Sequence, residues 1–408
     1  MADKLRGNLV VAQSGGPTAV INNSVVGVVD EAFRHACIEE VYGSFRGIGG
    51  ILEENLMDLR QEDPRTIRGL RSTPGAALGS IRLKVKDHHL PRMVEVFKAH
   101  NVRYFFYIGG NDSQITSDDV KNLAAQEGWE MRVIGIPKTI DNDLPETDHC
   151  PGFGSAARYT ATTIRELDRD NHSLPYVYVV EVMGRDAGWM TASAQLAKVD
   201  ERTGPHIILL PESVFDAQRF LDAVQNDVDR YGRCVIAVSE GIKDAEGNPV
   251  AAAEKVDAFG NRQLGGVSQT LAENIEERLG VSARWTKAAA IQRCATHIAS
   301  PTDVEEAYMV GLAAVRAAVD GETGKMVTLV RESDTPYRCT TGLVDLAKVR
   351  GRTRDVPIEW YNAQEMEMTE EFIKYVAPLA GPIPEVAILE GHFAAKLCAP
   401  WQDPSKKK

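Results

Sequence analysis

The chain lacks the features that mark membrane-spanning, secreted and disulfide-bonded proteins. No apolar run approaches the roughly 20 residues that a helix needs to cross a bilayer. The N-terminal segment Met1–Lys4 leads almost at once into a strand-like run, so we expect no signal peptide. The six cysteines lie far apart and form no CxxC pair, which favours free thiols over disulfides or a zinc site. We therefore expect a cytoplasmic protein that contacts no membrane.

The chain is also short of positive charge. It has 46 Lys and Arg residues against 58 Asp and Glu residues, and its formal net charge is −12. This balance argues against nucleic acid as a partner. An acidic chain binds anions only where Arg, Lys and backbone N–H groups gather locally. Any phosphate site must therefore be built by particular loops.

Short β-branched or aromatic runs alternate with amphipathic segments along the chain. Strands are expected at Leu9–Ala12, Tyr104–Ile108, Val133–Ile136, Val177–Val182, His206–Leu210 and Val235–Ser239. Helices are expected at Thr18–His35, Ser117–Glu127, about 155–168, Asp216–Tyr231 and Thr302–Asp320, the last with a capping box of Thr302 and Glu305. This alternation is typical of an α/β fold with parallel sheets flanked by helices.

These strands are too many for one sheet, so we expect two doubly wound (Rossmann-like) lobes. Ligands of such sheets bind beyond the carboxyl ends of the strands, which places the active site in the interlobe cleft. The segment after about Gly342 has weaker periodicity and several prolines. We expect it to be an appended C-terminal extension that packs on the core.

Two loops have the glycines of a phosphate cradle. The run GGNDS at 109–113 follows the strand Tyr104–Ile108, and its glycines allow a sharp turn that brings N–H groups close to a ligand. Its Asn, Asp and Ser oxygens suit a hard cation such as Mg²⁺. The run SGGP at 14–17 has the same order of strand, glycines and helix. A plain tight turn remains the alternative for the second run.

The loop after Val133–Ile136 carries the strongest signal. It reads PKTIDNDLP over residues 137–145, with a proline at each end. In an extended loop, Asp141 and Asp143 project to the same side. One carboxylate can then accept a proton from a substrate hydroxyl, while the other orients it or helps to hold a metal. Lys138 offers a positive charge to a phosphoryl group in transfer.

Three further strand ends carry a single charged group. Arg185 suits a bidentate grip on phosphate, Glu240 suits sugar hydroxyls, and Arg293 ends the run AIQR. Each alone is more often a surface residue, but five such loops at one edge indicate an anion site. The run GFGSAA at 152–157 fits a dinucleotide fingerprint only by spacing, because it follows a loop rather than a strand.

Together and in this order, the loops resemble the phosphofructokinase family from about residue 8 to residue 320. The motifs are Gly-Gly at 15–16, Gly-Ser-Ile-Arg at 79–82, GGNDS at 109–113, TIDND at 139–143, Met-Gly-Arg at 183–185, Glu-Gly at 240–241 and Gln-Arg at 292–293. The resemblance implies a donor-phosphate and Mg²⁺ lobe at 1–152 plus about 292–340, a sugar-phosphate lobe at 153–291, and a C-terminal extension at 341–408.

The resemblance also implies a role for each matching residue. Asp141 would be the general base for the sugar 1-hydroxyl, Asn111 would stand in the place of a Mg²⁺-associated aspartate, and Arg82 would steady the moving phosphoryl group. The donor phosphate would lie against Gly15, Gly16, Gly110 and Ser113. The sugar phosphate would contact Thr139, Ile140, Asp143, Met183, Gly184, Arg185, Glu240, Arg284, Ala290, Ile291, Gln292 and Arg293.

Two positions decide the phosphoryl donor. ATP-using members of the family usually have glycine where this chain has Asp112 and Lys138, so the pair resembles the pyrophosphate-dependent branch. A carboxylate at Asp112 would repel the α-phosphate of ATP, by about 1 kcal/mol at about 4 Å in water and about 4 kcal/mol at an effective dielectric of about 20. The Lys138 ammonium would neutralise the departing phosphate.

Two departures concern the acceptor. Tyr176 and Ala290 stand where ATP-type members have an arginine and a histidine, so the 6-phosphate must be held differently here. The resemblance implies a Mg²⁺-dependent, reversible glycolytic transfer from pyrophosphate to fructose 6-phosphate by a homodimer or homotetramer. The alternatives are another acceptor such as sedoheptulose 7-phosphate, an ATP-dependent kinase, and a non-catalytic subunit that binds sugar phosphates. The last should have lost its base, and Asp141 is present.

Overall fold

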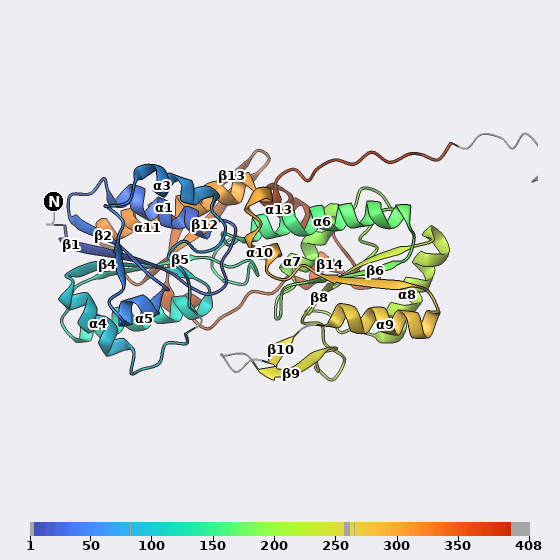
Figure 1. The fold of residues 1–408 in the computed structure, drawn as a ribbon, viewed down its shortest axis with the longest axis horizontal. Coiled ribbons are helices and arrows are strands. Elements are labelled where there is room, and N and C mark those ends of the chain that lie inside the picture. The colour runs from blue at the N-terminus through green and yellow to red at the C-terminus, as the bar shows by residue number, and fades with distance from the viewer. Residues whose placement is uncertain (1–3, 82, 257–261, 265, 393–408) are drawn as a thin grey trace, which may run out of the picture.

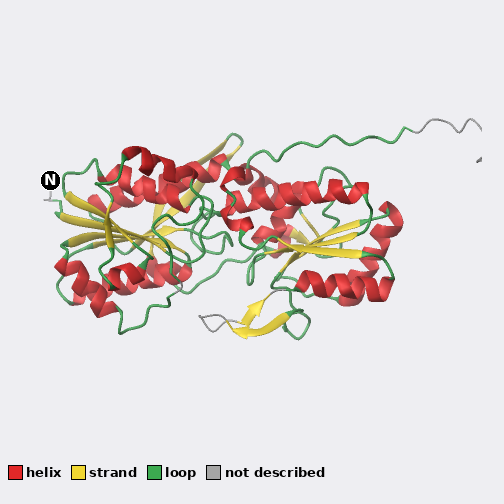
Figure 2. Cartoon of the chain, viewed as in Figure 1, coloured by secondary structure: helices red, strands yellow, loops and turns green. Residues whose placement is uncertain are grey.

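A computed structural model describes residues 4–81, 83–256, 262–264 and 266–392 of the chain. Arg82, an expected phosphate contact, lies outside the described residues. The chain forms two α/β lobes side by side, each with a central sheet between layers of helices (Figures 1 and 2). The two doubly wound lobes predicted from the alternating pattern are confirmed.

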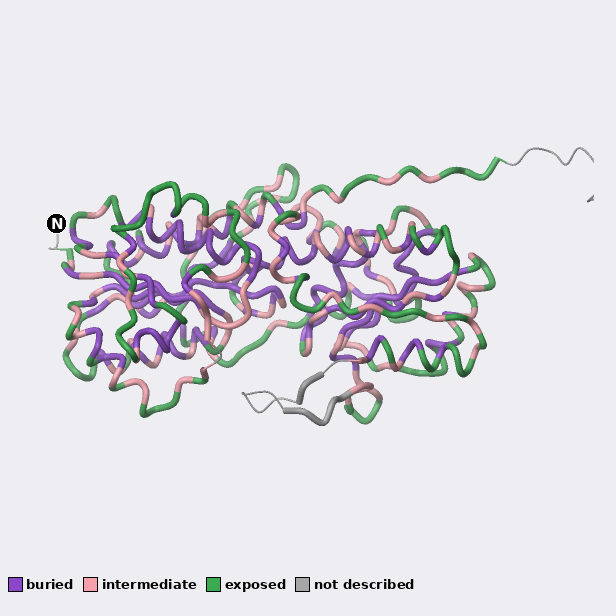
Figure 3. Tube along the Cα trace, viewed as in Figure 1, coloured by how far each residue is buried: buried purple, intermediate pink, exposed green. Residues whose placement is uncertain are grey.

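The first lobe is built on a seven-stranded sheet in the order β13-β12-β5-β4-β1-β2-β3. Its strands are β1 (Gly7–Gln13), β2 (Ile38–Ser44), β3 (Leu56–Asp58), β4 (Val102–Gly109), β5 (Arg132–Pro137), β12 (Lys325–Asp334) and β13 (Tyr337–Asp345). The strands from β12 to β2 are parallel, and the two edge strands are antiparallel. Strand β4 is apolar on both faces because helices cover it on both sides, as the buried central strands in Figure 3 show.

Helices α1 (Ile21–Ala32), α3 (Pro64–Gly69) and α11 (Pro301–Val319) cover one face of this sheet. Helices α2 (Ile48–Leu52), α4 (Leu90–Ala99) and α5 (Asn111–Gln126) cover the other. Along β4, Phe106 packs in the first layer and Phe105 in the second, which is the alternation of a strand buried on both sides. Helices α1 and α11 meet at Gly27, where a β-carbon would lie 2.3 Å from the main-chain oxygen of Tyr308.

The second lobe has a four-stranded parallel sheet in the order β11-β6-β8-β7. Its strands are β6 (Val177–Val182), β7 (Ile207–Leu209), β8 (Cys234–Ser239) and β11 (Ala283–Lys287). Helices α6 (Phe153–Ser173), α7 (Trp189–Ala192) and α13 (Glu370–Ala380) cover one face, and α8 (Ala217–Tyr231) and α9 (Val267–Leu279) cover the other. A small hairpin of β9 (Ala252–Val256) and β10 (Arg262–Leu264) stands below this lobe in Figure 1.

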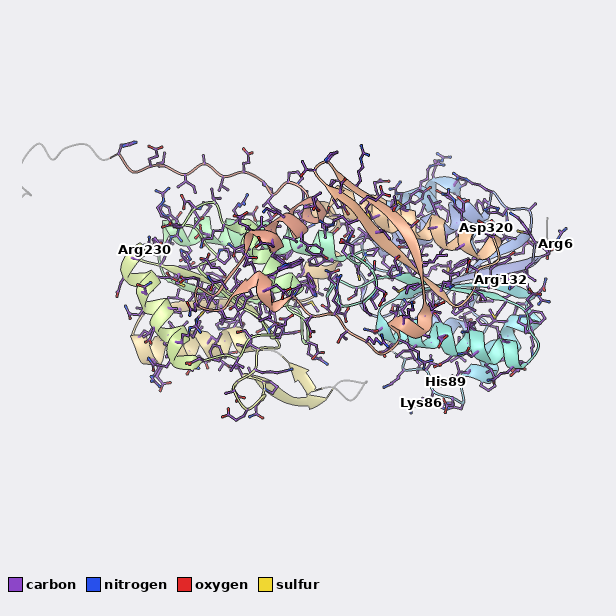
Figure 4. All side chains as sticks on the ribbon, turned by 180° about the vertical axis from the view of Figure 1, so that it is seen from behind. Arg6, Lys86, His89, Arg132, Arg230 and Asp320 are labelled. Atoms are coloured by element: carbon purple, nitrogen blue, oxygen red, sulfur yellow. The ribbon has the colours of Figure 1, made fainter. Side chains whose placement is uncertain are left out.

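The C-terminal segment is built into both lobes rather than appended to them. Strand β13 pairs with β12 as far as Asp345, so the expected boundary at residue 341 falls inside a strand of the first sheet. Seen from behind in Figure 4, this long hairpin runs along the lobe that carries the labelled Asp320, away from the labelled Arg230 of the second lobe. The chain continues through α12 (Leu346–Val349) against α5 and then crosses to the second lobe.

The remaining elements are short. They are α10 (Ile291–Cys294), the strands β14 (Tyr361–Asn362) and β15 (Glu367–Met368), and the 3₁₀ turns η1 (Leu70–Ser72), η2 (Ser193–Ala197), η3 (Thr296–Ile298) and η4 (Ile358–Trp360). After α13 the chain runs outward from the second lobe (Figure 1).

Of the helices that begin elsewhere than the sequence predicted, three show a local cause. Helix α5 begins at Asn111 rather than Ser117, because Gly109 and Gly110 complete the turn and the helix starts directly after them. Helix α1 begins at Ile21 rather than Thr18, after the turn of the glycine loop.

The third helix, α11, begins at Pro301, and the predicted capping box is wrong. Ser300 is the N-cap and accepts the N–H of Asp303. The Thr302 hydroxyl instead donates to the main-chain oxygen of Pro378, and Glu305 pairs with Arg71 at 2.6 Å. Both side chains of the expected capping box therefore bond to residues distant in the sequence instead of to the N-terminus of the helix.

The described cysteines, Cys37, Cys150, Cys234, Cys294 and Cys339, are all free thiols, as expected. Over the described residues, the longest helices are too polar or too short to traverse a bilayer.

Candidate active site

A cavity of about 330 Å³ opens at the carboxyl edge of the first sheet. It lies where the winding of the sheet reverses, since β1 is followed by β2 on one side and β4 lies on the other. Loops that sequence reasoning singled out separately meet here. The lining residues are Ser14, Gly15, Ile81, Leu83, Gly110, Asn111, Asp112, Ser113, Lys138, Thr139, Asp141, Asp143 and Thr353.

One wall of the cavity is the N-terminus of α5. Gly110 is the N-cap and Asn111 the first helical residue, so the run GGNDS presents free N–H groups and the positive end of the helix dipole. Asp112 is exposed in the first helical turn, where a carboxylate interacts favourably with that dipole. The amide oxygen Oδ1 of Asn111 is buried and has no hydrogen-bond partner among the described residues.

Lys138 closes the cavity between the ends of β5 and β1. Its side chain is buried, and its Nζ donates to the main-chain oxygen of Gly16 at 2.8 Å. A β-carbon on Gly15 would lie 3.3 Å from Nζ, and Gly15 has a φ of +70°, so glycine suits both the space and the turn. Burial lowers the pKa of Lys138 to about 8, although the nearby carboxylates of Asp141 and Asp143 favour its charged form.

The two carboxylates of the TIDND loop face the cavity for a reason other than the predicted one. The loop is not extended, because Asn142 between them has a φ of +53°. Burial, with the neighbouring charges of Asp143 and Glu240, raises the pKa of Asp141 to about 7. Burial also raises the pKa of Asp143, against a hydrogen bond from Thr139 that lowers it. Asp141 therefore exchanges its proton near neutral pH, as a general base must.

Residues of the second lobe form a neighbouring group. The N–H of Met183, which follows β6, donates to Oε1 of Gln292 at 3.1 Å, and Gln292 Nε2 donates to Thr160 at 2.8 Å. Arg185 passes so close to Gly241 that a β-carbon there would lie 1.8 Å from the Arg185 main-chain oxygen.

Two of the arginines predicted to contact the sugar phosphate have an unused donor. The Nε atoms of Arg185 and Arg293 are buried and have no partner within the described part of the chain. Arg293 also connects the two groups of residues, because its Nη1 lies 2.9 Å from the position of a β-carbon on Gly16. Partly exposed guanidinium groups with free N–H donors fit a bound phosphate.

Glu240 follows β8 and is tied to the strand ends. Its N–H donates to the Val182 main-chain oxygen at 3.0 Å, and its carboxylate lies 3.6 Å from the ammonium of Lys287. Burial raises the pKa of Glu240, against the nearby charge of Lys287. Lys287 is itself paired with the buried Glu181 at 2.5 Å.

Some of the residues predicted to contact the sugar phosphate lie away from these two groups of residues. The Ile140 side chain packs in the hydrophobic cluster of the second lobe, which leaves only its backbone for a ligand. Ala290 and Ile291 are exposed. Arg284 lies on the exposed strand β11, where its guanidinium stacks on the ring of Tyr176 at 4.3 Å.

Sequence reasoning gave no role to four residues of the cavity wall. Ser14 and Ile81 lie inside the motifs SGGP and Gly-Ser-Ile-Arg, and Leu83 directly follows the second motif, so membership of a motif or position beside one was an available signal. Thr353 comes from the C-terminal segment, which had no recognisable motif. The pairing of Lys287 with Glu240 was also unforeseen, since the 46 intervening positions, 241–286, carry no pattern that links them.

An ammonium, free guanidinium donors and a helix N-terminus lie beside a carboxylate that titrates near neutral pH. Such a constellation on two α/β lobes defines a phosphotransferase that acts on a hydroxyl acceptor. A profile of the family described as Phosphofructokinase matches residues 8–318. The chain belongs to the phosphofructokinase family.

Named relatives match nearly the whole chain. The pyrophosphate–fructose 6-phosphate 1-phosphotransferase of Halomonas elongata is 44% identical over 382 residues, which cover 91% of each chain. The protein of the same name from Xanthomonas campestris is 42% identical over 416 residues, with 97% of this chain and 99% of the relative covered. The crystal structure of the pyrophosphate-dependent phosphofructokinase from Marinobacter aquaeolei superposes with a TM-score of 0.85 at 40% identity, covering 96% of this chain and 98% of that one.

Proposed function

We propose that the protein is a pyrophosphate-dependent 6-phosphofructokinase of glycolysis. It transfers a phosphoryl group reversibly from pyrophosphate to the 1-hydroxyl of fructose 6-phosphate, giving fructose 1,6-bisphosphate and phosphate. One observation supports the choice of donor above the rest: Asp112 and Lys138 line the same cavity. The names of the relatives at 42–44% identity agree with it.

The charges in the cavity suit a short inorganic donor. The positive end of α5 attracts an anion, but the Asp112 carboxylate already interacts with it. A donor with three phosphates and a nucleoside would have to place its α-phosphate near this carboxylate, against a repulsion of about 1–4 kcal/mol. Pyrophosphate has no such group and can lie between the glycine loops and Lys138.

The transfer needs a base and a stabilised leaving group. Asp141 accepts the proton of the sugar 1-hydroxyl while that oxygen attacks one phosphorus of pyrophosphate and the bridging P–O bond breaks. Lys138 neutralises the charge that develops on the departing phosphate, and the N–H of Gly16 contacts the donor. Ionised Asp141 and charged Lys138 coexist where their pKa values of about 7 and about 8 leave both forms populated.

The site also fits Mg²⁺. The buried Oδ1 of Asn111, without a partner among the described residues, is an oxygen ligand of the kind Mg²⁺ accepts, and donor phosphates and water would supply the other positions. Bound there, the ion would neutralise phosphate charge. Asn111 would hold it from the first turn of α5, on the same wall as Gly110 and Ser113.

The sugar phosphate is assigned to the second group of residues. Arg185 and Arg293 would bind phosphate through their free donors, and Glu240 would accept hydrogen bonds from sugar hydroxyls. Backbone groups of Thr139, Ile140, Met183, Gly184 and Gln292 and the carboxylate of Asp143 would complete the contacts. Arg284, Ala290 and Ile291 are exposed on this chain and are proposed as contacts only within the assembled enzyme.

We place the donor-phosphate lobe at 1–152 plus about 292–340 and the sugar-phosphate lobe at 153–291. Strand β13 extends the first lobe to Asp345, so the C-terminal extension begins after it. The enzyme is proposed to act in the cytoplasm as a homodimer or homotetramer. Light scattering at several protein concentrations tests the assembly.

The donor is tested with purified protein, Mg²⁺, fructose 6-phosphate and either pyrophosphate or ATP. Formation of fructose 1,6-bisphosphate is followed through an aldolase-coupled assay. Turnover with pyrophosphate and little or none with ATP is expected, and turnover with ATP alone overturns the assignment. Competition with sedoheptulose 7-phosphate in the same assay tests the acceptor.

A further inference from the structure

The loop that carries Asp141 is held from outside by the C-terminal segment. We propose that Arg354 and Tyr375 are positioning residues for the transfer: they fix the loop of residues 139–150 so that the Asp141 carboxylate faces the cavity. This inference rests on the proposed function, because it takes Asp141 as the base.

Arg354 donates hydrogen bonds to main-chain oxygens at both ends of the loop. Its Nη2 donates to the oxygen of Asn142 at 2.8 Å, and its Nη1 donates to the oxygens of Thr147 at 2.8 Å and Asp148 at 2.6 Å. Its own N–H donates to the oxygen of Asp143 at 2.8 Å. Charge-assisted hydrogen bonds are roughly twice as strong as neutral ones, so this one cation is a strong restraint on the loop backbone.

Tyr375, on α13, makes a second connection to the same loop. Its hydroxyl donates to the Asp148 main-chain oxygen at 2.8 Å and accepts from Nδ2 of Asn142 at 2.9 Å. The Asn142 amide oxygen in turn accepts the N–H of Cys150 at 2.9 Å. The buried Asn142 side chain is thus held from two directions.

The restrained residue is the one that sets the direction of the carboxylates. Asn142 lies between Asp141 and Asp143 and has a φ of +53°, a backbone conformation that residues other than glycine adopt rarely. If Asn142 relaxed to negative φ, the chain direction would change between the two carboxylates. The contacts from Arg354 and Tyr375 fall on this residue and on the main chain of Thr147 and Asp148, so they oppose that change.

The same arginine also contacts the second lobe. The guanidinium lies 4.7 Å from the ring of Trp189, and Trp189 Nε1 donates to the Arg354 main-chain oxygen at 3.0 Å. Trp189 begins α7, directly after the loop that carries Arg185. The preceding residue, Thr353, lines the cavity itself. Arg354, on the segment between α12 and β14, therefore joins the base loop of one lobe to the residues that follow the proposed sugar-phosphate loop of the other.

A residue that only braced the fold would change stability, whereas a positioning residue changes the rate of the folded enzyme. The chain offers a matched pair for this comparison. Tyr375 and Tyr361 are both tyrosines of the C-terminal segment whose hydroxyls donate to a main-chain oxygen, but Tyr361 bonds to Ile208 in the second sheet at 2.7 Å. Tyr375→Phe and Tyr361→Phe each lose a hydroxyl and keep the ring.

The experiment measures kcat, the KM of both substrates and the thermal unfolding midpoint of the two variants and the wild type. A displaced base lowers kcat with little effect on binding, and a shift of about 1 Å can cost about 100-fold. We expect Tyr375→Phe to lose about tenfold in kcat, with both KM values within about twofold of wild type, and Tyr361→Phe to keep kcat within about twofold. Equal kcat values for the two variants would overturn the proposal.

Chemical rescue gives a second readout. Arg354→Ala is expected to lose about 100-fold in kcat, and millimolar guanidinium is expected to recover at least about fivefold of it. Methylammonium, which lacks the planar fork of donors, should recover nothing. Folded Arg354→Ala that guanidinium does not rescue counts against the proposal, and if this variant does not fold, the tyrosine pair decides. A wild type inactive with pyrophosphate contradicts the proposed function instead, and the variants are then compared with ATP.

Discussion

The ammonium of Lys138 donates to the main-chain oxygen of Gly16 across 2.8 Å, and so joins the ends of β5 and β1 at the wall of the cavity. This contact does two things. It fills the space beside the glycine loop, since a β-carbon on Gly15 would lie 3.3 Å from Nζ. It also presents a positive charge where a phosphate would depart, although burial lowers the pKa of the lysine to about 8. Under the proposed function, both the fit of the donor and the stabilisation of the leaving group involve this one side chain.

Replacing Lys138 by Met keeps most of the stem and removes the charge. Loss of one preorganised stabiliser typically costs about 10²–10³ in rate, and we expect a drop of that size in kcat with pyrophosphate. Lys325→Met is the control, because Lys325 is paired with Asp345 on the first lobe, outside the cavity wall. A kcat for Lys138→Met within a factor of about two of wild type contradicts the assigned role.

Asp141→Asn removes the proposed base while leaving its shape. General base catalysis contributes about 10²–10⁴ in rate, so kcat should fall by that factor with both KM values little changed. Because burial raises the pKa of Asp141 to about 7, its carboxyl costs the fold stability as the pH rises from about 4 to about 7, and the full cost is present above that. The variant should therefore be at least as stable as wild type at pH 8. Asp186→Asn, at an exposed neighbour, should retain activity.

The two shifted groups predict a narrow pH optimum. Asp141 must be ionised, so kcat/KM should rise as the pH passes its pKa of about 7, and Lys138 must be protonated, so kcat/KM should fall as the pH passes about 8. Lys138→Met should lose the fall on the alkaline side and keep the rise on the acid side. Pyrophosphate itself gains protons as the pH falls, which also changes kcat/KM. Because Lys138→Met retains that effect, its pH profile serves as the reference for it. A flat wild-type profile from pH 6 to 9 would refute the assignment.

Asp112→Asn removes the charge that should exclude nucleotides. A repulsion of about 1–4 kcal/mol corresponds to at least about fivefold in kcat/KM with ATP, and we expect a gain of that size or more relative to pyrophosphate. Asp119→Asn, on the same helix and paired with Arg350 at 3.0 Å, is the matched control. No gain with ATP would mean that something other than this carboxylate selects the donor.

Gly241→Ala tests how the second lobe places Arg185. A β-carbon at this position would lie 1.8 Å from the Arg185 main-chain oxygen, so the loop must move. We expect the KM for fructose 6-phosphate to rise by about tenfold or more, since about 1.4 kcal/mol of lost binding suffices for that factor. Gly69→Ala, where a β-carbon would have nothing within 4 Å, should leave both KM values unchanged.

Much of this architecture was open to prediction because its signals are local. Buried strands such as β4 read as unbroken apolar runs, and the glycine and carboxylate loops directly follow them. The first residues of the helices were harder to predict. The turn residues of GGNDS were expected to form a loop, yet the helix begins inside the motif, because two glycines were enough to turn the chain.

The support of the base loop could not be predicted from sequence. Arg354 and Tyr375 contact Asn142 across separations of 212 and 233 residues, and such pairs leave no periodic trace. Nothing in the sequence showed that Asn142 adopts positive φ, so the carboxylates were expected to share a side for the wrong reason. Ile140 was carried over with its motif, although its side chain belongs to the hydrophobic core.

The choice of donor is tested most directly by ³¹P NMR of the purified protein with Mg²⁺, fructose 6-phosphate, pyrophosphate and ATP in one tube. We expect the pyrophosphate signal to decay while the signals of fructose 1,6-bisphosphate and phosphate grow and the three ATP signals stay constant. Loss of the γ-phosphate signal of ATP with pyrophosphate untouched would contradict this choice of donor.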